Sequence, residues 1–270
     1  MNYLTKFTTE AAYDAQKATL VYPNVSLFAD TGEVRYEKTN PVTNGHDCVD
    51  LGLTYNGNKI LFATMNLGAS SPEEYGDYYA WGETTKRYTN LSGNTVVGGT
   101  FTWSNALYHT GDDYATGWTK YIPAGQDSYW SGEGSPDNKV ELDASDDIVR
   151  KEWGGDWRMP TRYELALLVN NCTWEYTADY NGTGVKGYVL TGPNGNTLFL
   201  PLAGCCYGTD RDDAGTYCCL WSSSLFTSTP HYAWYLYAWW TSEDDAVHGV
   251  DAGYRCRGFS VRAVLPVPIE

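Results

Sequence analysis

The histidines and acidic residues of this chain have no spacing typical of a catalytic or metal centre. Histidine occurs only at positions 46, 109, 231 and 248, not at the short intervals of a zinc site. Paired aspartates at 112–113, 146–147, 212–213 and 244–245 could hold a structural calcium ion, although hydrated acidic loops are the simpler interpretation. With neither a phosphate-binding loop nor a Ser-His-Asp pattern, we expect no enzymatic activity and no cofactor.

The seven cysteines include two adjacent doublets, Cys205-Cys206 and Cys218-Cys219. No pair has the CxxC spacing, which argues against a zinc site and a thioredoxin-like motif. Reduced, partly buried thiols are the first interpretation. A bridge between the doublets across a hairpin is the alternative, and it would require an oxidising compartment.

The segment 231–258 is built like a binding surface. It crowds tyrosine and tryptophan together and continues into an acidic run with a histidine. A strand periodicity of two assigns to one face, the expected core face, Trp234, Leu236, Ala238 and Trp240. The other face then presents, beside Ala233, the outward side chains of Tyr235, Tyr237 and Trp239. Such rings provide rigid amphipathic contact area for recognition. The alternative is a central strand that is buried on both faces.

Composition limits the class of protein and its partners. Aromatic residues make up 15% of the 270 positions and glycine occurs 28 times, which favours short strands and turns over a helical bundle. The net charge of −15 argues against nucleic acid and anionic membranes as partners. No apolar run is long enough to span a bilayer, and the first residues lack a secretory signal. We therefore expect a place in a virion, such as a phage tail, or on a bacterial surface reached by another route.

The chain divides into a short arm, 1–45, and a main domain, 46–270. The arm combines a capped helix at 11–20 with two short strands at 25–28 and 34–36, too little to hold a core alone. We expect it to dock or to make the chain oligomeric.

Hairpins and helices alternate with long loops in the main domain. The expected hairpins are 49–66, around Asn56-Gly57, and 187–200, around Pro193-Asn194-Gly195. Acidic residues lead a helix at 143–153, and a capping box starts a second at 161–169. The stretch 83–137 is expected to form long loops, and the last strands are expected at 221–225, 233–240 and 259–264. The fold class is α+β.

Several motifs resemble those of C-type-lectin-like domains of the formylglycine-generating-enzyme type. The run Trp153-Gly154-Gly155-Asp156-Trp157-Arg158-Met159-Pro160-Thr161-Arg162-Tyr163-Glu164 is similar to the family's Trp-Arg-(Leu/Met)-Pro-Thr-x-x-Glu signature. Asn66-Leu67-Gly68-Ala69, the run 75–83, Trp221-Ser222-Ser223-Ser224 and Phe259-Ser260-Val261-Arg262 follow in the family's order. Together they resemble the major paralogous domain of surface proteins in gut bacteria and their phages.

One class within this fold is especially similar: the variable proteins of diversity-generating retroelements, including phage tropism determinants. That resemblance implies a variable region at about 205–264 on a fixed scaffold. The implied scaffold positions are Trp157, Arg158, Trp221, Ser222, Ser223, Ser224, Leu225, Ala233, Trp234, Leu236, Gly258, Phe259, Val261 and Arg262. The implied ligand-binding positions are Phe226, Thr229, His231, Tyr232, Tyr235, Tyr237, Trp239, Trp240, Asp244, Asp245, His248, Asp251, Tyr254 and Cys256.

The resemblance favours binding of a protein or glycan ligand on a cell surface, with the arm as the device for a homotrimer. A bacterial adhesin or pilus-associated subunit is the first alternative. A formylglycine-generating oxidase is the second, because that family holds copper with a cysteine pair near the end of the fold. Cys218, Cys219 and Cys256 lie in that region, but none stands in the family's motif context. Fold alone does not decide between these functions.

Overall fold

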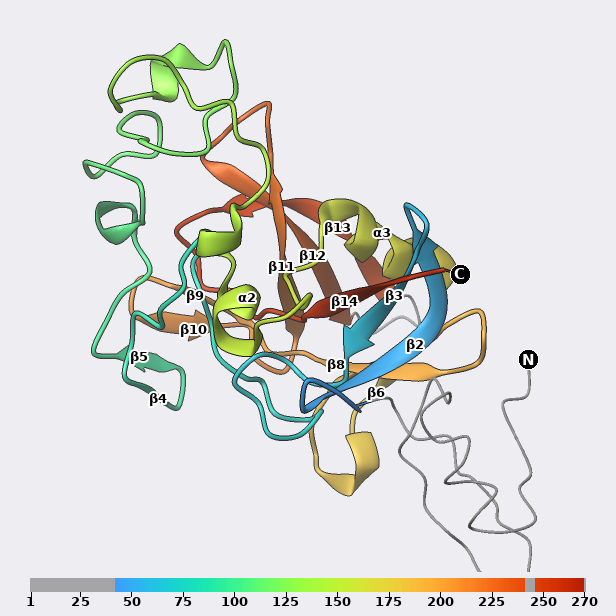
Figure 1. Cartoon of the computed structure of the whole chain (residues 1–270). Coiled ribbons are helices and arrows are strands. Elements are labelled where there is room, and N and C mark those ends of the chain that lie inside the picture. Colours follow the sequence, from blue (N-terminus) through green and yellow to red (C-terminus); the bar gives the residue numbers. More distant parts are fainter. Residues whose placement is uncertain (1–41, 241–245, 270) are drawn as a thin grey trace, which may run out of the picture.

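The computed structural model describes residues 42–240 and 246–269, a mostly β structure with two α-helices (Figure 1). The coarse expectation of a β-rich α+β fold is confirmed. Most of the arm 1–45, with its expected helix and strands, lies outside the described residues, as do Asp244 and Asp245. Its last residues form strand β1 (Val42–Thr43), which pairs with β2, so the described body begins slightly before position 46.

The first antiparallel sheet joins the beginning and the end of the described chain. Its order is β1-β2-β3-β14, with β2 at His46–Tyr55, β3 at Asn58–Ala63 and β14 at Val264–Pro268. Asn56 and Gly57 both have positive φ, 48° and 78°, as the tight turn of the expected first hairpin requires.

The second sheet, β11-β12-β13, carries the segment that the sequence marks as a binding surface. Its strands are Tyr217–Leu225, Tyr232–Trp240 and Ala246–Tyr254. Helix α3 (Arg162–Asn171) packs against all three strands, and the expected capping box of Thr161 and Glu164 begins it. Strand β13 was not expected. The expected strand 259–264 was wrong: Phe259 and Ser260 make only isolated bridges, to Tyr79 and Leu220, and the strand starts at Val264.

Two further sheets complete the described β structure. The third, β6-β7-β8, consists of Thr173–Thr177, Gly187–Thr191 and Thr197–Pro201, and it includes the expected second hairpin. A 3-10 turn, η5 (Tyr180–Gly182), lies between β6 and β7. The fourth sheet, β4-β5-β10-β9, is built from Asn90–Ser92, Thr95–Val97, Asp210–Asp212 and Cys205–Tyr207.

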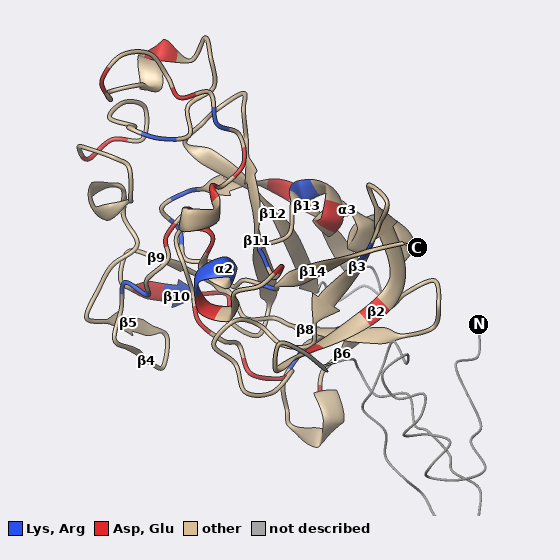
Figure 2. Ribbon diagram, in the orientation of Figure 1, with Lys and Arg blue, Asp and Glu red and all other residues tan. Residues whose placement is uncertain are grey.

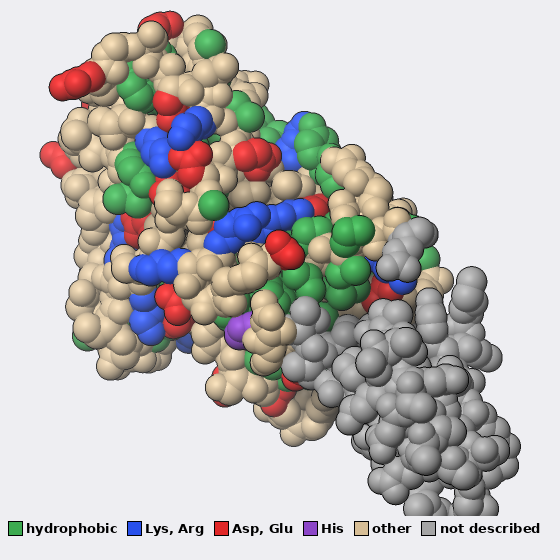
Figure 3. Space-filling model, viewed as in Figure 1, with side chains coloured by type: hydrophobic (Ala, Val, Ile, Leu, Met, Phe, Trp, Pro, Cys, Tyr) green, Lys and Arg blue, Asp and Glu red, His purple; other side chains and the backbone are tan. Residues whose placement is uncertain are grey.

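The segment 98–139 projects from one end of the molecule as long loops, drawn in green (Figure 1). It contains only two 3-10 turns, η2 (Trp103–Asn105) and η3 (Asp127–Tyr129). Acidic side chains mark its tip (Figures 2 and 3). The stretch 83–137 is therefore largely irregular, as expected, apart from the short strands β4 and β5.

The acidic helix begins later than expected. Asp147 accepts hydrogen bonds from the backbone N–H groups of Val149 and Arg150, which caps α2 at Ile148–Trp153. The residues before this cap form the 3-10 turn η4 (Ala144–Asp146).

The core is divided into four clusters of buried side chains. Trp157, Trp221 and Phe259 are at most 1% exposed and share the first cluster, in agreement with their expected scaffold position. Arg158 forms a bidentate ion pair with Glu164, with N···O distances of 2.6 and 2.7 Å. Arg262 is fully buried and donates to Asn66 Oδ1 (2.9 Å) and the Ala63 carbonyl (3.1 Å).

Ser222 and Ser223, the other expected scaffold polar residues, are also buried, with Ser222 Oγ donating to the Trp234 carbonyl. Within 42–240 and 246–269, no helix is long and apolar enough to cross a bilayer.

Candidate ligand-binding surface

Strand β12 has one face packed on α3 and the second core cluster. Leu236 and Ala238 are fully buried there. Trp234 is only half-buried, because it lies at the edge of this face between the Arg162 guanidinium and the Phe226 ring, at 4.9 Å from each. The expected core face is therefore correct for Leu236 and Ala238 and wrong for Trp240, which is 45% exposed at the end of the strand.

The opposite face of β12 changes from core to surface along the strand. Ala233 is fully buried, Tyr235 is half-buried, and Trp239 is 41% exposed. Tyr235 packs on Phe259 and Trp221, with ring centroids 4.8 and 6.1 Å away. The expectation that Tyr235 points outward holds only in part, because the Phe259 ring covers part of its side chain.

Burial raises the pKa of Tyr235 well above its ordinary value, with neighbouring Cys219 and Tyr217 adding to the shift. Interaction between the two phenol groups raises the pKa of Tyr235 further and opposes the rise in the pKa of Tyr217. Burial likewise raises the pKa of Tyr217 to about 12. Both phenols thus remain uncharged donors at neutral pH.

Three rings beyond Tyr235 form a group that we call the strand-end face: Tyr217, Tyr237 and Trp239. Their centroids lie 5.4–6.4 Å apart. Tyr217 is paired with Trp239 across β11 and β12, so the three side chains share one side of the sheet. The sheet backbone fixes their positions, which provides a pre-organised aromatic surface.

Strand β13 leaves room for these rings. Gly249 is paired with Tyr237, and a Cβ at position 249 would lie 2.8 Å from the Tyr237 hydroxyl oxygen. Asp251 is paired with Tyr235 and is exposed at the border of the strand-end face. An aromatic surface with a carboxylate at its edge can stack on a flat apolar group and accept hydrogen bonds from its polar rim.

Trp240 and His248 lie on the other side of the sheet and are supported by β6. Trp240 is 45% exposed and stacks on Tyr176, at a centroid distance of 4.7 Å. His248 stacks on Trp174 at 4.2 Å. The end of β12 therefore displays aromatic rings on both faces.

A second group of rings surrounds His231 at the start of β12. Tyr232, Tyr114 and Tyr254 have centroids 4.4, 4.8 and 5.9 Å from the imidazole. His231 is only 4% exposed, so the expectation that it faces a ligand is wrong. Burial, with a contribution from the Arg255 charge, lowers its pKa to about 4. His231 is therefore a neutral packing residue at physiological pH.

Cys256 is also buried, contrary to its expected place among outward positions. It is 0% exposed and packs in the fourth cluster with Trp118 and Ile122. Its neighbour Arg255 occupies the adjacent interior, with its guanidinium 3.9 Å from the centre of the Trp118 ring. The turn that follows β13 folds inward over the base of the long loops, which the period-two pattern could not reveal.

Phe226 and Thr229 lie in the turn between β11 and β12, where both are partly exposed. The Thr229 carbonyl accepts a hydrogen bond from the Tyr232 N–H at 2.9 Å, which closes that turn. The structure thus separates the sequence-predicted positions into the strand-end face, the β6-supported side, and this turn with the His231 group.

All seven cysteines are free thiols. Cys205 and Cys219 are close enough to hydrogen-bond, which lowers the pKa of Cys205, whereas burial raises the pKa of Cys218 and Cys256 to about 12. Cys218, Cys219 and Cys256 belong to three different core clusters, so they do not converge on one ion.

Several carboxylates of the described aspartate pairs bind side chains or backbone groups of this chain. Asp146 binds Lys120 and the hydroxyl of Tyr108, and Asp147 caps α2. The Asp113 carboxylate accepts from the N–H groups of Ala115 and Thr116. In the part of the chain that the structure describes, no three His, Cys, Asp or Glu side chains gather in a metal-binding group.

Sequence reasoning missed Tyr217. Its signal was available, since Tyr217, Cys219 and Trp221 alternate along β11 with the same period as the outward residues of β12. The contribution of Tyr114 could not be found in this way, because a long irregular loop brings it to the sheet.

Comparison of the chain with protein-family models, with curated proteins and with solved structures found no match in any of the three.

Proposed function

We propose that this protein binds a protein or glycan ligand on a cell surface, with the strand-end face as the centre of the binding site. The observation that carries this proposal is the exposure of Trp239, at 41%, beside Tyr217 and Tyr237 on one side of a rigid sheet. Tryptophan and tyrosine dominate binding energy when their rings become covered at an interface. A cluster of exposed aromatic rings at one end of a strand is typical of a surface that becomes covered by a partner.

The finer proposal is a C-type-lectin-like domain that serves as the variable protein of a diversity-generating retroelement, in a phage tail or on a bacterial surface. Its support is the order of the motifs in the sequence and the burial of the implied scaffold residues Trp157, Trp221 and Phe259. The partial exposure of Tyr237, Trp239 and Asp251, between these fixed residues, is what a fixed frame with changeable positions requires. The buried His231 and Cys256 and the half-buried Tyr235 are better assigned to the frame.

The test is binding of the full chain to bacterial cells and to extracted surface material. A variant with Tyr217→Ala, Tyr237→Ala and Trp239→Ala should lose binding by a hundredfold or more, about 3 kcal/mol, as clustered interface rings do. Tyr163→Ala is the matched control, since Tyr163 is 48% exposed on α3 and is outside the proposed site. Equal binding by the triple variant and the parent would refute the site, provided that the parent binds.

A further inference from the structure

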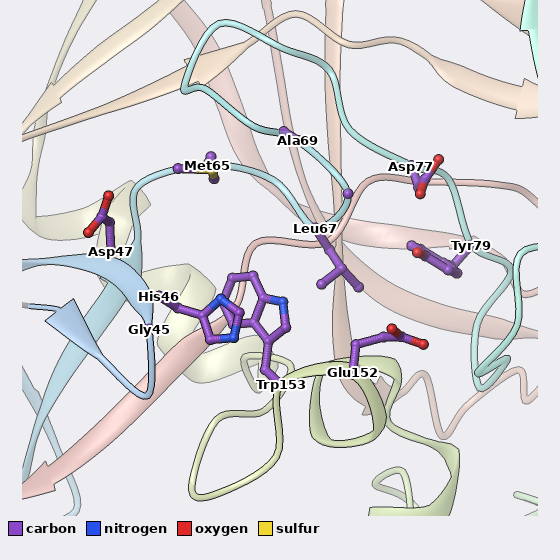
Figure 4. A pocket seen from close by; sticks show the side chains of 11 residues that line it. Gly45, His46, Asp47, Met65, Leu67, Ala69, Asp77, Tyr79, Glu152 and Trp153 are labelled. Atoms are coloured by element: carbon purple, nitrogen blue, oxygen red, sulfur yellow. The ribbon is translucent and has the colours of Figure 1, made fainter.

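A cavity that is separate from the strand-end face lies where the first hairpin meets α2. Its volume is about 470 Å³, within the range of small-molecule sites. It is lined by residues from the start of β2, the segment 65–69, the segment 77–79 and the end of α2 (Figure 4). None of its lining residues belongs to the strand-end face.

Aromatic and apolar side chains form part of its wall. His46 stacks on Trp153 with a centroid distance of 3.9 Å and an interplanar angle of 11°. Leu67 and Met65 continue this wall (Figure 4). Burial lowers the pKa of His46 despite the opposing effect of Asp47, so the ring is neutral at physiological pH. The wall can therefore accept alkyl groups and a cation beside the rings.

The charged groups of the cavity are all acidic. Asp47, Asp77 and Glu152 line it, and none of the described lining residues is a lysine or arginine. Asp77 is already neutralised by Lys86 at 3.0 Å and hydrogen-bonded by the Tyr88 hydroxyl. Asp47 and Glu152 are both exposed, and neither has a lysine or arginine within ion-pair distance among the described residues, so their carboxylates give the rim of the cavity its negative charge.

Tyr79 supplies a hydroxyl to the same cavity. Burial, together with the charges of Asp77 and Glu152, raises its pKa well above the ordinary value. The phenol stays protonated and can donate or accept a hydrogen bond. Figure 4 shows the Glu152 carboxylate on the same side of the cavity as Tyr79.

We propose that this cavity binds a small organic ammonium ion, with its alkyl groups on the His46–Trp153 wall and its charge toward Glu152. An anionic ligand would meet uncompensated like charge there. A neutral apolar ligand would pack on the wall but would gain no electrostatic attraction from the carboxylates.

The test is an NMR titration of the full chain with choline, compared with its neutral isostere 3,3-dimethylbutan-1-ol. Choline should bind at least about tenfold more tightly than the alcohol, and Glu152→Gln should remove about tenfold of that affinity. Glu175→Gln is the matched control, because Glu175 is an exposed glutamate on β6 away from the cavity, and it should leave choline binding unchanged.

Three results would overturn the proposal: no choline binding, equal binding of the two probes, or equal choline affinity in Glu152→Gln and the parent. Trp239→Ala should leave choline binding unchanged. A loss in that variant would place the ammonium site on the strand-end face and would also contradict the inference. Thermal unfolding of each variant separates lost binding from lost folding.

Discussion

In the β11-β12-β13 sheet, the two ends of the face that carries Tyr235 and Trp239 differ in how far other side chains cover them. At the Trp221 end, the Phe259 ring stacks on Trp221 at 4.1 Å and packs on Tyr235. At the Trp239 end, the same face has Tyr217, Tyr237 and Trp239 in contact with each other, and Trp239 is 41% exposed. A period-two pattern assigns side chains to a face, but the covering segment decides whether that face is core or surface.

The largest effect expected from this difference is on stability at the covered end. Trp221→Ala should lower the free energy of unfolding by about 3–5 kcal/mol, since it removes a fully buried ring and the hydrogen bond from its N–H to the Tyr79 carbonyl. Trp239→Ala should cost no more than about 1 kcal/mol. Chemical denaturation of both variants measures the two losses in the free energy of unfolding. Equal losses would show that the two ends are alike.

Tyr235 should give an intermediate result. Tyr235→Ala is expected to lower the free energy of unfolding by about 2–3 kcal/mol, because it removes the packing of the ring on Phe259 and Trp221. Tyr235→Phe, which keeps the ring, should lose only about 1 kcal/mol. A Tyr235→Ala protein as stable as the parent would show that Tyr235 behaves as a surface residue.

The sequence predicted the hairpins, the capping box and the core side of β12, because each depends on local pairs or on periodicity. Asn56-Gly57 and Thr161–Glu164 are examples in which a few neighbouring residues determine the backbone. It did not predict β13, in which two glycines, two alanines and an aspartate weaken the strand character that two valines and a tyrosine provide. That strand forms because β12 offers it a complete antiparallel partner.

The candidate site was predicted only in part, because local periodicity does not show which distant segments cover a strand. Tyr237 and Trp239 follow from alternation, but the burial of His231 and Cys256 and the partial burial of Tyr235 depend on segments distant in sequence. No local pattern contains the information that Phe259 covers Tyr235.

A smaller and more selective effect is expected at Gly249. Gly249→Ala would place a methyl group 2.8 Å from the Tyr237 hydroxyl, and the end of that side chain can move away. We expect a change in stability of less than about 1 kcal/mol, together with weaker ligand binding. Binding and thermal unfolding should be measured on the same preparation. A variant that binds like the parent would show that the position of Tyr237 is unimportant.

The His231 group should respond to pH in a way that the strand-end face does not. His231 has a pKa of about 4 in the folded protein and the ordinary value of 6.5 when unfolded. The unfolded chain therefore binds a proton first, and stability is lost as the pH falls from 6.5 toward 4. His231→Phe should reduce this slope in denaturation experiments between pH 7 and 4. An unchanged slope would show that His231 is not the group responsible.

The most direct test of a fixed frame with changeable positions is to sequence the last two hundred or so bases of this gene in many related genomes. The account predicts frequent substitutions at Tyr237, Trp239, Trp240 and Asp251. It also predicts a reverse transcriptase gene and a near-copy template repeat beside the gene. Trp221 and Phe259 should be invariant, and the buried Cys256 should change far less than Trp239. Substitutions spread equally over buried and exposed positions would contradict the account.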